Sequence, residues 1–252
     1  MYTDLHCHLL PGVDDGVSDE KESAACLERA RQEKITTLVV TPHIHPDRYP
    51  NDPGDLRARF GAWSARARRM GFSVYLGCEA YYHPGLARAF KEGDVLPLGP
   101  SGRFLLVELP MGFFPRGASR GFYDLRLEGV EPLLAHPERY VFAQEDPARL
   151  AALAESGIPF QLTTHSIAGW FGKTIQKTAF YILERGWGTV IASDAHKPKA
   201  RAPMFREAVR VLAARYGKTA AYQLSMVNPR RVLEGLPLKP VQCRPRRGLF
   251  RP

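Results

Sequence analysis

The sequence predicts an α/β protein folded as a (β/α)7 barrel, and three observations carry this prediction. Seven short apolar segments alternate with helical segments along almost the whole chain, an order typical of a parallel sheet with helical crossovers. At 252 residues the chain is long enough for one large α/β domain, and closure of the sheet into a barrel is the economical arrangement. Finally, strand after strand ends in a histidine or a carboxylate.

The predicted strands follow from runs of apolar and β-branched residues. The first predicted strand carries His6 and His8 and ends at Pro11-Gly12. The second lies at residues 35–41 (Ile-Thr-Thr-Leu-Val-Val-Thr). Such runs are typical of buried strands. The remaining strands are expected at residues 72–82, 103–108, 130–135, 158–164 and 188–193.

Helices are expected between these strands. Ser18 is placed to cap the first helix, which has acidic residues in its first turn and runs to about Lys34. Further helices are expected at residues 55–70, 84–91, 147–157, 171–186, 203–216, 219–226 and 229–233, with one more after the Gly/Phe/Pro-rich loop at 112–121. We see no repeat beyond the βα unit and no linker, so residues 1–240 are predicted to form a single domain. Residues 241–252 are basic and Pro-rich and are expected to be a mobile tail.

Composition sets the broad class of protein. Hydrophobic residues make up 44% and charged residues 24% of the chain, which is ordinary for a globular protein. No apolar stretch approaches the roughly 20 residues needed to span a bilayer, and no signal peptide is apparent, so a cytoplasmic location is expected. The four cysteines form no Cys-x-x-Cys pair, and a disulfide framework is not expected. A formal net charge of +9 fits either simple solubility or a preference for anionic partners.

The stretch around the first strand contains the first candidate site residues. Alternate side chains of a strand point to the same side, so His6 and His8 would project together, as a metal pair requires. Asp14 and Asp15 follow in the next loop. A single His-x-His is a weak signal, since many histidines have no metal role, and the other strands decide the question by repeating the pattern.

Metal-ligand residues end most of the predicted strands. Because the carboxyl ends of barrel strands converge on one mouth, we expect these side chains to meet there. They are His6, His8, His43, Glu79, Glu108, His136, Asp194 and His196. Imidazoles mixed with carboxylates suit Mn²⁺, Fe²⁺ or Zn²⁺. Because so many candidate ligands exceed the need of one ion, a cluster of two or three is predicted. His45, His83 and His165 also follow strand ends but are assigned less firmly.

Such a cluster favours phosphoester hydrolysis, because neighbouring metals activate a water and clamp the attacking and leaving oxygens of an in-line displacement. The phosphate also needs other cations. Arg139, three residues after His136, and Arg201, seven after Asp194, are placed to supply them.

The sequence resembles the PHP (polymerase and histidinol phosphatase) superfamily. Within it, the sequence is most similar to the bacterial metal-dependent tyrosine phosphatases associated with capsule and exopolysaccharide gene clusters. The resemblance covers about residues 1–235 and rests on motifs that occur in order. These are the blocks at residues 4–16 (DLHCHLLPGVDDG), 41–43 (TPH), 77–82 (GCEAYY), 106–110 (LVELP), 135–140 (AHPERY), 192–196 (ASDAH) and 228–230 (NPR).

The resemblance implies a distorted TIM-like barrel of the PHP type with a site for two to three divalent ions, commonly Mn²⁺, with Fe, Zn or Mg as alternatives. Carried over residue by residue, His6, His8, Glu79 and Asp194 would hold one ion. Glu79, Glu108 and His136 would hold a second, and Asp15, His43 and His196 a third. Asp15 matches the family pattern, whereas Asp14 is left to shape the loop. Arg139 and Arg201 would bind the substrate phosphate.

The implied reaction is hydrolysis of phosphotyrosine, with in-line attack by a metal-bridging hydroxide. The implied substrate is a phosphotyrosine protein, for which the tail of a bacterial tyrosine kinase is one candidate. The chain has no Cys-x₅-Arg loop, so a cysteinyl-phosphate mechanism is not supported. An oligomer is compatible with the sequence.

Three alternatives stay open. The first is a phosphatase acting on histidinol phosphate or another small phosphoester. The second is a nuclease, although the basic residues form no aromatic-interleaved stripe. The third is a metal-bound regulatory protein without catalysis, against which the intact ligand set argues. The loop 111–116 (MGFFPR) lies outside the usable match. Its aromatic residues would line a phosphotyrosine pocket or, the interpretation we favour from sequence, cap the barrel.

Overall fold

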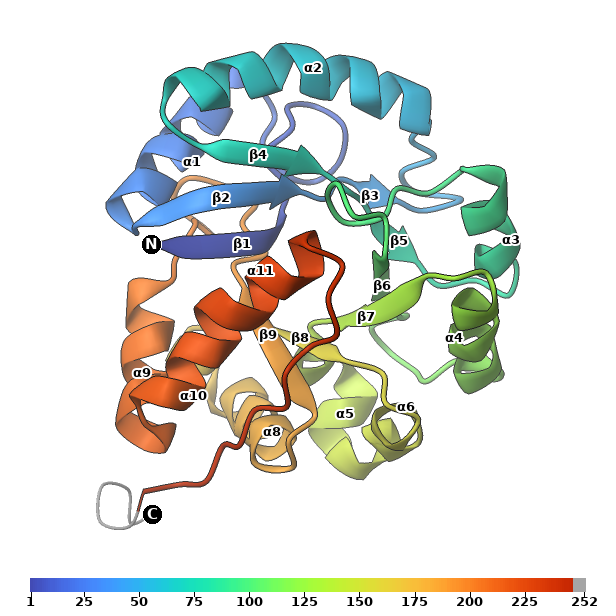
Figure 1. Ribbon diagram of the computed structural model, residues 1–252, viewed down its shortest axis with the longest axis vertical. Helices are drawn as coiled ribbons and strands as arrows, with labels where there is room; N and C mark the ends of the chain where they lie inside the picture. Colours follow the sequence, from blue (N-terminus) through green and yellow to red (C-terminus); the bar gives the residue numbers. More distant parts are fainter. Residues whose placement is uncertain (247–252) are drawn as a thin grey trace.

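The computed structural model describes residues 1–246 of the chain, and within them nine strands form two parallel sheets. A three-stranded sheet has the order β1-β2-β4, and a six-stranded sheet has the order β3-β5-β6-β7-β8-β9 (Figure 1). The strands are β1 Tyr2–Cys7, β2 Ile35–Val40, β3 His43–Ile44, β4 Ser73–Leu76, β5 Glu79–Tyr81, β6 Phe104–Glu108, β7 Glu131–Ala135, β8 Phe160–Thr163 and β9 Gly188–Ala192.

The break between the two sheets explains why seven predicted strands become nine. The predicted strand at 72–82 divides into β4 and β5, and a short β3 follows β2 after Pro42. The amide of Gly77 bonds to the first sheet through Val40 O, whereas the amide of Glu79 bonds to the second through Pro42 O. A side chain at Gly77 would meet Leu98 at 2.9 Å, so the chain changes sheets where only glycine fits.

The end of β1 joins the segment after β9 and closes the barrel. Cys7 forms a parallel bridge with Ala195, and the amides of His8 and Asp194 donate to Ala195 O and His6 O at 2.7 and 2.8 Å. Buried Asp4 reinforces this join, because its carboxylate accepts from the Ser193 amide at 2.8 Å and from the Ser193 hydroxyl. The expected barrel of parallel strands is confirmed, and its distortion is the split between the two sheets.

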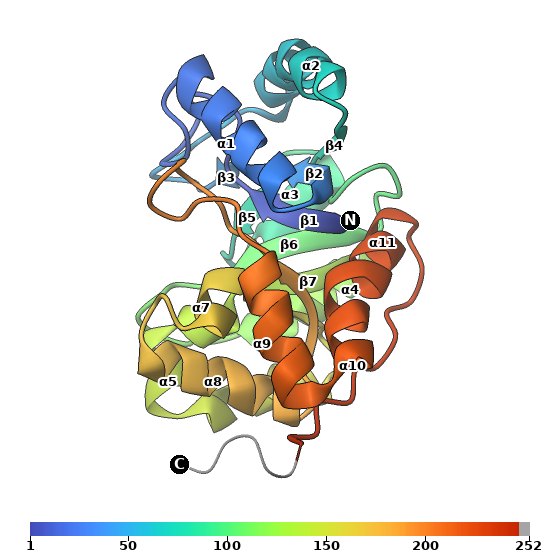
Figure 2. The ribbon, with the colours of Figure 1, turned by 90° about the vertical axis from the view of Figure 1, so that its left-hand side faces the viewer.

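Helices surround this barrel (Figures 1 and 2). The α-helices are α1 Glu20–Gln32, α2 Pro53–Arg69, α3 Leu86–Glu92, α4 Ala118–Leu127, α5 Val141–Glu145, α6 Ala151–Glu155, α7 Thr164–Ala168, α8 Lys173–Glu184, α9 Arg206–Tyr216, α10 Lys218–Tyr222 and α11 Asn228–Leu233, with 3₁₀ turns η1 Pro137–Arg139 and η2 Pro147–Leu150 and a π turn η3 Gln223–Val227. No helix within residues 1–246 has both the length and the apolar character to cross a bilayer.

Helix α1 begins one residue later than expected. Asp19, rather than Ser18, is its N-cap, since the Asp19 carboxylate accepts from the Glu22 amide at 2.8 Å. Ser18 instead donates its amide and hydroxyl to the Glu22 carboxylate. Both residues therefore form hydrogen bonds that stabilise the N-terminus of α1, which a search for a single N-cap residue does not reveal.

Two apolar layers hold the strands in place. Alternate residues of β6, β7 and β9 fill the barrel interior: Phe104 and Leu106, Leu133 and Ala135, and Val190 and Ala192. The residues between them pack outward against the helices. Glu108 and Asp194 continue the inward rows of β6 and β9 by two residues, which brings both carboxylates over the barrel interior.

The segment after α11 returns along the body. Val241 and Cys243 are buried in the outer apolar layer, and the Arg246 amide donates to Arg215 O at 3.0 Å. Part of the tail that was expected to be mobile therefore packs against α8 and α9. Its last residues, 247–252, lie outside the described residues.

Candidate metal centre

The predicted ligands converge at the carboxyl ends of the strands, where three groups of side chains place their ligand atoms within 4.8 Å of one another. The groups are His6, His8, Glu79 and Asp194; His8, Asp15, His43 and His196; and His43, Glu79 and Glu108. His136 adjoins the third group, with Nε2 at 2.8 Å from Glu79 Oε1 and 3.7 Å from Glu108 Oε1. The structure thus brings all nine predicted ligands together.

The innermost group is tightly packed around one point. The Nε2 atoms of His6 and His8 are 3.0 Å apart and lie 3.0 and 3.2 Å from Glu79 Oε2. Asp194 Oδ1 lies 3.3 Å from the Nε2 atom of His6, and it is buried without a hydrogen-bond partner. Converging ring nitrogens and an unpartnered carboxylate oxygen are the environment that a divalent cation satisfies.

The carboxylates crowd one another, which also favours cations. Burial raises the pKa of Glu108, and the nearby charges of Glu79 and Asp194 raise it further, well above its usual range. Burial likewise acts to raise the pKa of Glu79, but interaction with the His6, His43 and His136 imidazoles outweighs it and holds that pKa well below its usual range. Burial lowers the pKa of His136 and His196 to about 4, so these rings are neutral at pH 7 with a nitrogen lone pair available to a metal.

Outer hydrogen bonds fix the orientation of two histidines. His6 Nδ1 lies 2.8 Å from Gln161 Oε1, and His8 Nδ1 lies 2.7 Å from Asp14 Oδ2. A proton on each Nδ1 leaves each Nε2 free to face the cluster. Sequence reasoning missed Gln161, although a polar residue between Phe160 and Leu162 in a buried strand was a usable signal.

The two neighbouring aspartates face different groups. Asp15 Oδ1 lies 3.4 Å from Nε2 of both His43 and His196, so it faces the cluster. Asp14 turns away and also accepts the amides of Gly16 and His43. A side chain at Gly16 would lie 2.2 Å from His8 O, so this turn requires glycine.

Three site residues hold unusual backbone conformations. Among residues 1–246, four non-glycine residues have positive φ, and they include His136 at 31°, Asp194 at 53° and Arg201 at 54°. This region is costly for side chains with a Cβ, on the order of 1–2 kcal/mol for each residue. Strain gathered at one place is a mark of a functional site, and here it aims side chains from β7, β9 and the following loop into the centre.

Both predicted phosphate-binding arginines donate hydrogen bonds to the carboxylate of Asp194. Arg201 Nη2 is 2.5 Å from Asp194 Oδ2, and Arg139 Nη1 contacts the same oxygen. Burial acts to raise the pKa of Asp194, but the positive charge of Arg201, His6 and Arg139 keeps it well below its usual range. Arg201 Nε is buried without a hydrogen-bond partner, so it has a donor available for an anion.

A cleft of about 460 Å³ opens above the centre. The two arginines and seven of the nine ligands line it, whereas the other two, His6 and His8, are buried outside its lining. Of the loop aromatics, Phe114 packs against Phe142 as the expected cap, whereas Phe113 is 60% exposed and lines the cleft. Our sequence interpretation therefore holds for one ring and not for the other.

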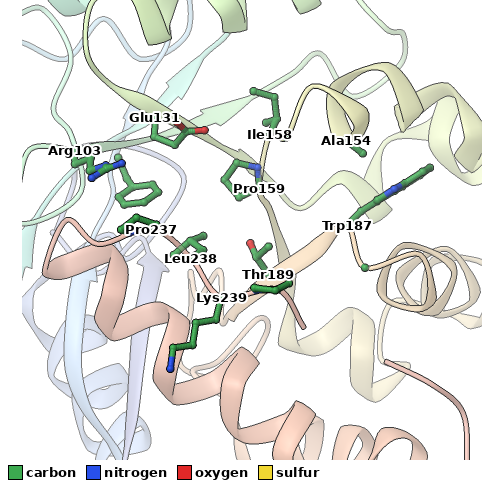
Figure 3. A pocket seen from close by; sticks show the side chains of 14 residues that line it. Arg103, Glu131, Ala154, Ile158, Pro159, Trp187, Thr189, Pro237, Leu238 and Lys239 are labelled. Carbon is green, nitrogen blue, oxygen red and sulfur yellow. The ribbon is translucent and has the colours of Figure 1, made fainter. Parts of the chain in front are cut away.

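A second cavity, of about 330 Å³, lies at the amino ends of the strands (Figure 3). Phe104, Pro159 and Thr189 from the starts of three strands line it, together with Leu238 from the segment after α11. None of the nine predicted metal ligands lines this cavity, and neither does Arg139 or Arg201. The chemistry-bearing residues belong to the carboxyl end, where barrels of this kind place their active sites.

A distorted barrel with nine clustered imidazoles and carboxylates and two adjacent arginines defines the class of metal-dependent hydrolases. Comparison with known proteins narrows this class. The family described as "Capsular polysaccharide synthesis, CpsB/CapC" matches residues 2–234, and the chain belongs to that family.

Relatives and solved structures agree with this assignment. The chain is 33% identical to the tyrosine-protein phosphatase YwqE of Bacillus subtilis over 88% of each chain, and 27% identical to CpsB of Streptococcus pneumoniae over 91% of this chain and 97% of that one. A structure from a study of YwqE and CpsB, described as unique metal-dependent tyrosine phosphatases, superposes with a TM-score of 0.89, 30% identity, and coverage of 98% and 100%. A β-aspartyl dipeptidase from Fervidobacterium islandicum shares the fold, with a TM-score of 0.55 and 15% identity.

Proposed function

We propose that this protein is a metal-dependent tyrosine-protein phosphatase whose cluster and paired arginines act together on phosphotyrosine. The observation that carries the proposal is the position of Arg139 and Arg201, which hold one face of Asp194 while its other face meets the histidines. Two guanidinium groups and a set of metal ligands therefore meet at one carboxylate, which would place donors for phosphate oxygens beside the metal site.

The residues present fit two or three divalent ions, and we expect Mn²⁺ to support activity. His6, His8, Glu79 and Asp194 would hold one ion, Glu79, Glu108 and His136 a second, and Asp15, His43 and His196 a third. When bound, such ions lower the pKa of a water and neutralise charge that develops on phosphate oxygens. His43 lies in two of the observed groups, which supports close spacing of the ions.

The protein's own groups bind and orient the substrate. The guanidinium groups of Arg139 and Arg201 donate to phosphate oxygens, and the planar fork of each suits two oxygens at once. Arg139 is held from the other side by the Phe171 ring, 5.3 Å from its guanidinium carbon. The leaving phenolate has a pKa near 10, so it departs more readily than an alkoxide.

Phosphotyrosine proteins are the proposed substrates, and the tail of a bacterial tyrosine kinase is one such partner. The net charge of +9 favours acidic phosphopeptides through long-range attraction. The four cysteines are free and buried, which supports a reducing compartment such as the cytoplasm.

The test is phosphate release by metal-stripped protein with Mn²⁺ restored. Three substrates are compared at equal concentration: a phosphotyrosine peptide, histidinol phosphate and a single-stranded oligonucleotide. We expect Mn²⁺-dependent release from the peptide above the other two. Preference for histidinol phosphate or the oligonucleotide would overturn the proposed substrate, and binding of Mn²⁺ with no hydrolysis of any of them would indicate a regulatory protein.

A further inference from the structure

The mouth of the cleft has two chemically different sides. The cationic side consists of Arg139, after β7, and Arg201, after β9. The other side comes from β5 and from the loops after β3 and β6, which are neighbours in the sheet: His45, Tyr49, Tyr81, Met111 and Phe113, with Arg48 of the loop after β3 beside them. We call this second side the aromatic wall. The metal ligands connect the two sides, because Asp194 contacts both arginines and His43 stacks on Tyr49 of the wall.

This division sets the direction in which a phosphomonoester lies. A phosphate held by the two arginines over the ligand cluster leaves its ester group on the opposite side of the mouth. We propose that the aromatic wall is a subsite for the phenyl ring of phosphotyrosine and that Phe113 is the residue that most determines selection of aryl over alkyl phosphomonoesters. This inference rests on the proposed phosphatase function and deepens it.

The loop that carries Phe113 is anchored, so the ring is held at the mouth. At the start of the loop, Met111 O accepts from the Val141 amide at 2.8 Å. At its other end, Phe114 packs edge-on against Phe142, with ring centroids 5.7 Å apart. Between these anchors Phe113 remains 60% exposed and Met111 37% exposed. Two large apolar side chains left in water at the edge of a site gain from covering a substrate ring.

The rest of the wall is already organised as paired rings. His45 and Tyr81 have ring centroids 4.0 Å apart, and Tyr49 stacks on His43 at 5.4 Å with an interplanar angle of 14°. Aromatic pairs favour a further ring in an offset or edge-on position. Phosphoserine lacks such a ring. Because its side chain is short, its peptide main chain would have to enter the cleft beside the aromatic wall for the phosphate to reach the arginines.

The experiment compares two peptides of identical flanking sequence, one with phosphotyrosine and one with phosphoserine, in Mn²⁺-loaded enzyme. Phe113→Ala is expected to lower kcat/KM for the phosphotyrosine peptide about tenfold, mainly through KM, and to leave kcat/KM for the phosphoserine peptide within about twofold. Phe113→Tyr is expected to restore the ratio, and Phe113→Leu to restore it only in part. Tyr123→Ala is the matched control, because Tyr123 is an exposed aromatic residue on α4 outside the cleft.

The outcomes separate this inference from the proposed function. Wild-type protein that fails to release phosphate from the phosphotyrosine peptide overturns the proposed function. With that activity present, an equal loss on both peptides, or no change in Phe113→Ala, overturns the role of Phe113. A loss in Phe113→Ala that Phe113→Tyr does not restore also contradicts ring recognition. The folded state of each variant is checked by its melting temperature, which an exposed side chain should leave unchanged.

Discussion

The side-chain oxygen of Gln161 lies 2.8 Å from Nδ1 of His6, on the side of the ring opposite the cluster. His6 is fully buried, so this amide decides which ring nitrogen carries the proton. A proton on Nδ1 leaves the lone pair of Nε2 available to a metal that Glu79 and Asp194 would also hold. Gln161, which is not itself a predicted metal ligand, thereby orients the ligand His6.

Replacing Gln161 should weaken metal binding. Gln161→Met keeps the volume but removes the acceptor, and we expect Mn²⁺ affinity to fall by about 10–100-fold, the usual effect of losing such a partner. Gln161→Glu keeps an acceptor and is the matched control. Isothermal titration of metal-stripped protein measures both. Unchanged affinity in Gln161→Met would show that the amide does not set the ring orientation.

Asp14 and Asp15 should separate stability from metal content. Asp14→Ala removes an acceptor shared by His8 and the amides of Gly16 and His43. Hydrogen bonds to a charged group are worth about 1.5–3 kcal/mol each, so the melting temperature of metal-free protein should drop by several degrees. Asp15→Ala should leave that temperature nearly unchanged and reduce bound Mn²⁺ by about one ion, measured by elemental analysis. Equal effects of the two substitutions would contradict this division.

Arg139 should serve the phosphate rather than the metals. Arg139→Lys keeps a positive charge beside Asp194 but loses the planar fork. We expect unchanged Mn²⁺ content and a fall in kcat/KM of about 10²-fold, the order of effect seen when one donor to a reacting oxygen is removed. Arg201→Lys should behave alike. Loss of metal in either variant would mean that the arginine supports the ligand Asp194 and not the substrate.

Much of the site was predictable because its parts are local in sequence. Eight of the nine ligands lie at or near the end of a predicted strand, and strand ends of a parallel barrel share one face, so position along the chain was enough to collect these eight. Asp15 was added only by the family resemblance. The contacts of Gln161 with His6 and of Arg139 with Asp194 join residues 155 and 55 positions apart. Their pairing depends on strand register and loop path, which apolar periodicity does not specify.

Prediction of the strands and helices was limited in the same way, by contacts between residues that are distant in sequence. The apolar run from Phe72 to Tyr82 reads as one strand, and the structure divides it at Gly77 because a side chain there would clash with Leu98. That clash arises from a segment some twenty residues later. Helix α7 was missed for a similar reason, since Thr164, His165 and Ser166 are polar yet buried and lack the amphipathic pattern of a surface helix.

The cysteines should be inert in the folded enzyme. Burial raises the pKa of Cys26, Cys78 and Cys243 to about 12, and a raised pKa leaves almost no thiolate at pH 8, where the reactive form would otherwise be abundant. Iodoacetamide at that pH should modify none of these thiols and leave activity intact, whereas unfolded protein should be modified at all of them. Mass spectrometry of the intact chain distinguishes the states. Inactivation in step with the labelling of one cysteine would indicate a thiol nucleophile.

Metal removal should lower stability as well as activity. Without cations, Glu79, Glu108 and Asp194 repel one another in a buried site, and the raised pKa of Glu108 reflects its burial together with that repulsion. A ligand that binds only the folded state stabilises it by about 2.7 kcal/mol at 100 times its Kd, so saturating Mn²⁺ should raise the melting temperature by roughly 5–10 °C for a chain of this size. The gain should shrink as the pH falls, because protons compete with the metal for the imidazole ligands. His6 and His8 should bind protons first, since their neighbouring carboxylates outweigh burial and raise their pKa, and His136 and His196 only near pH 4. His136→Ala should show a smaller gain and less bound metal. A melting temperature that does not respond to Mn²⁺ in the wild type would contradict the metal centre, whatever the activity on phosphotyrosine.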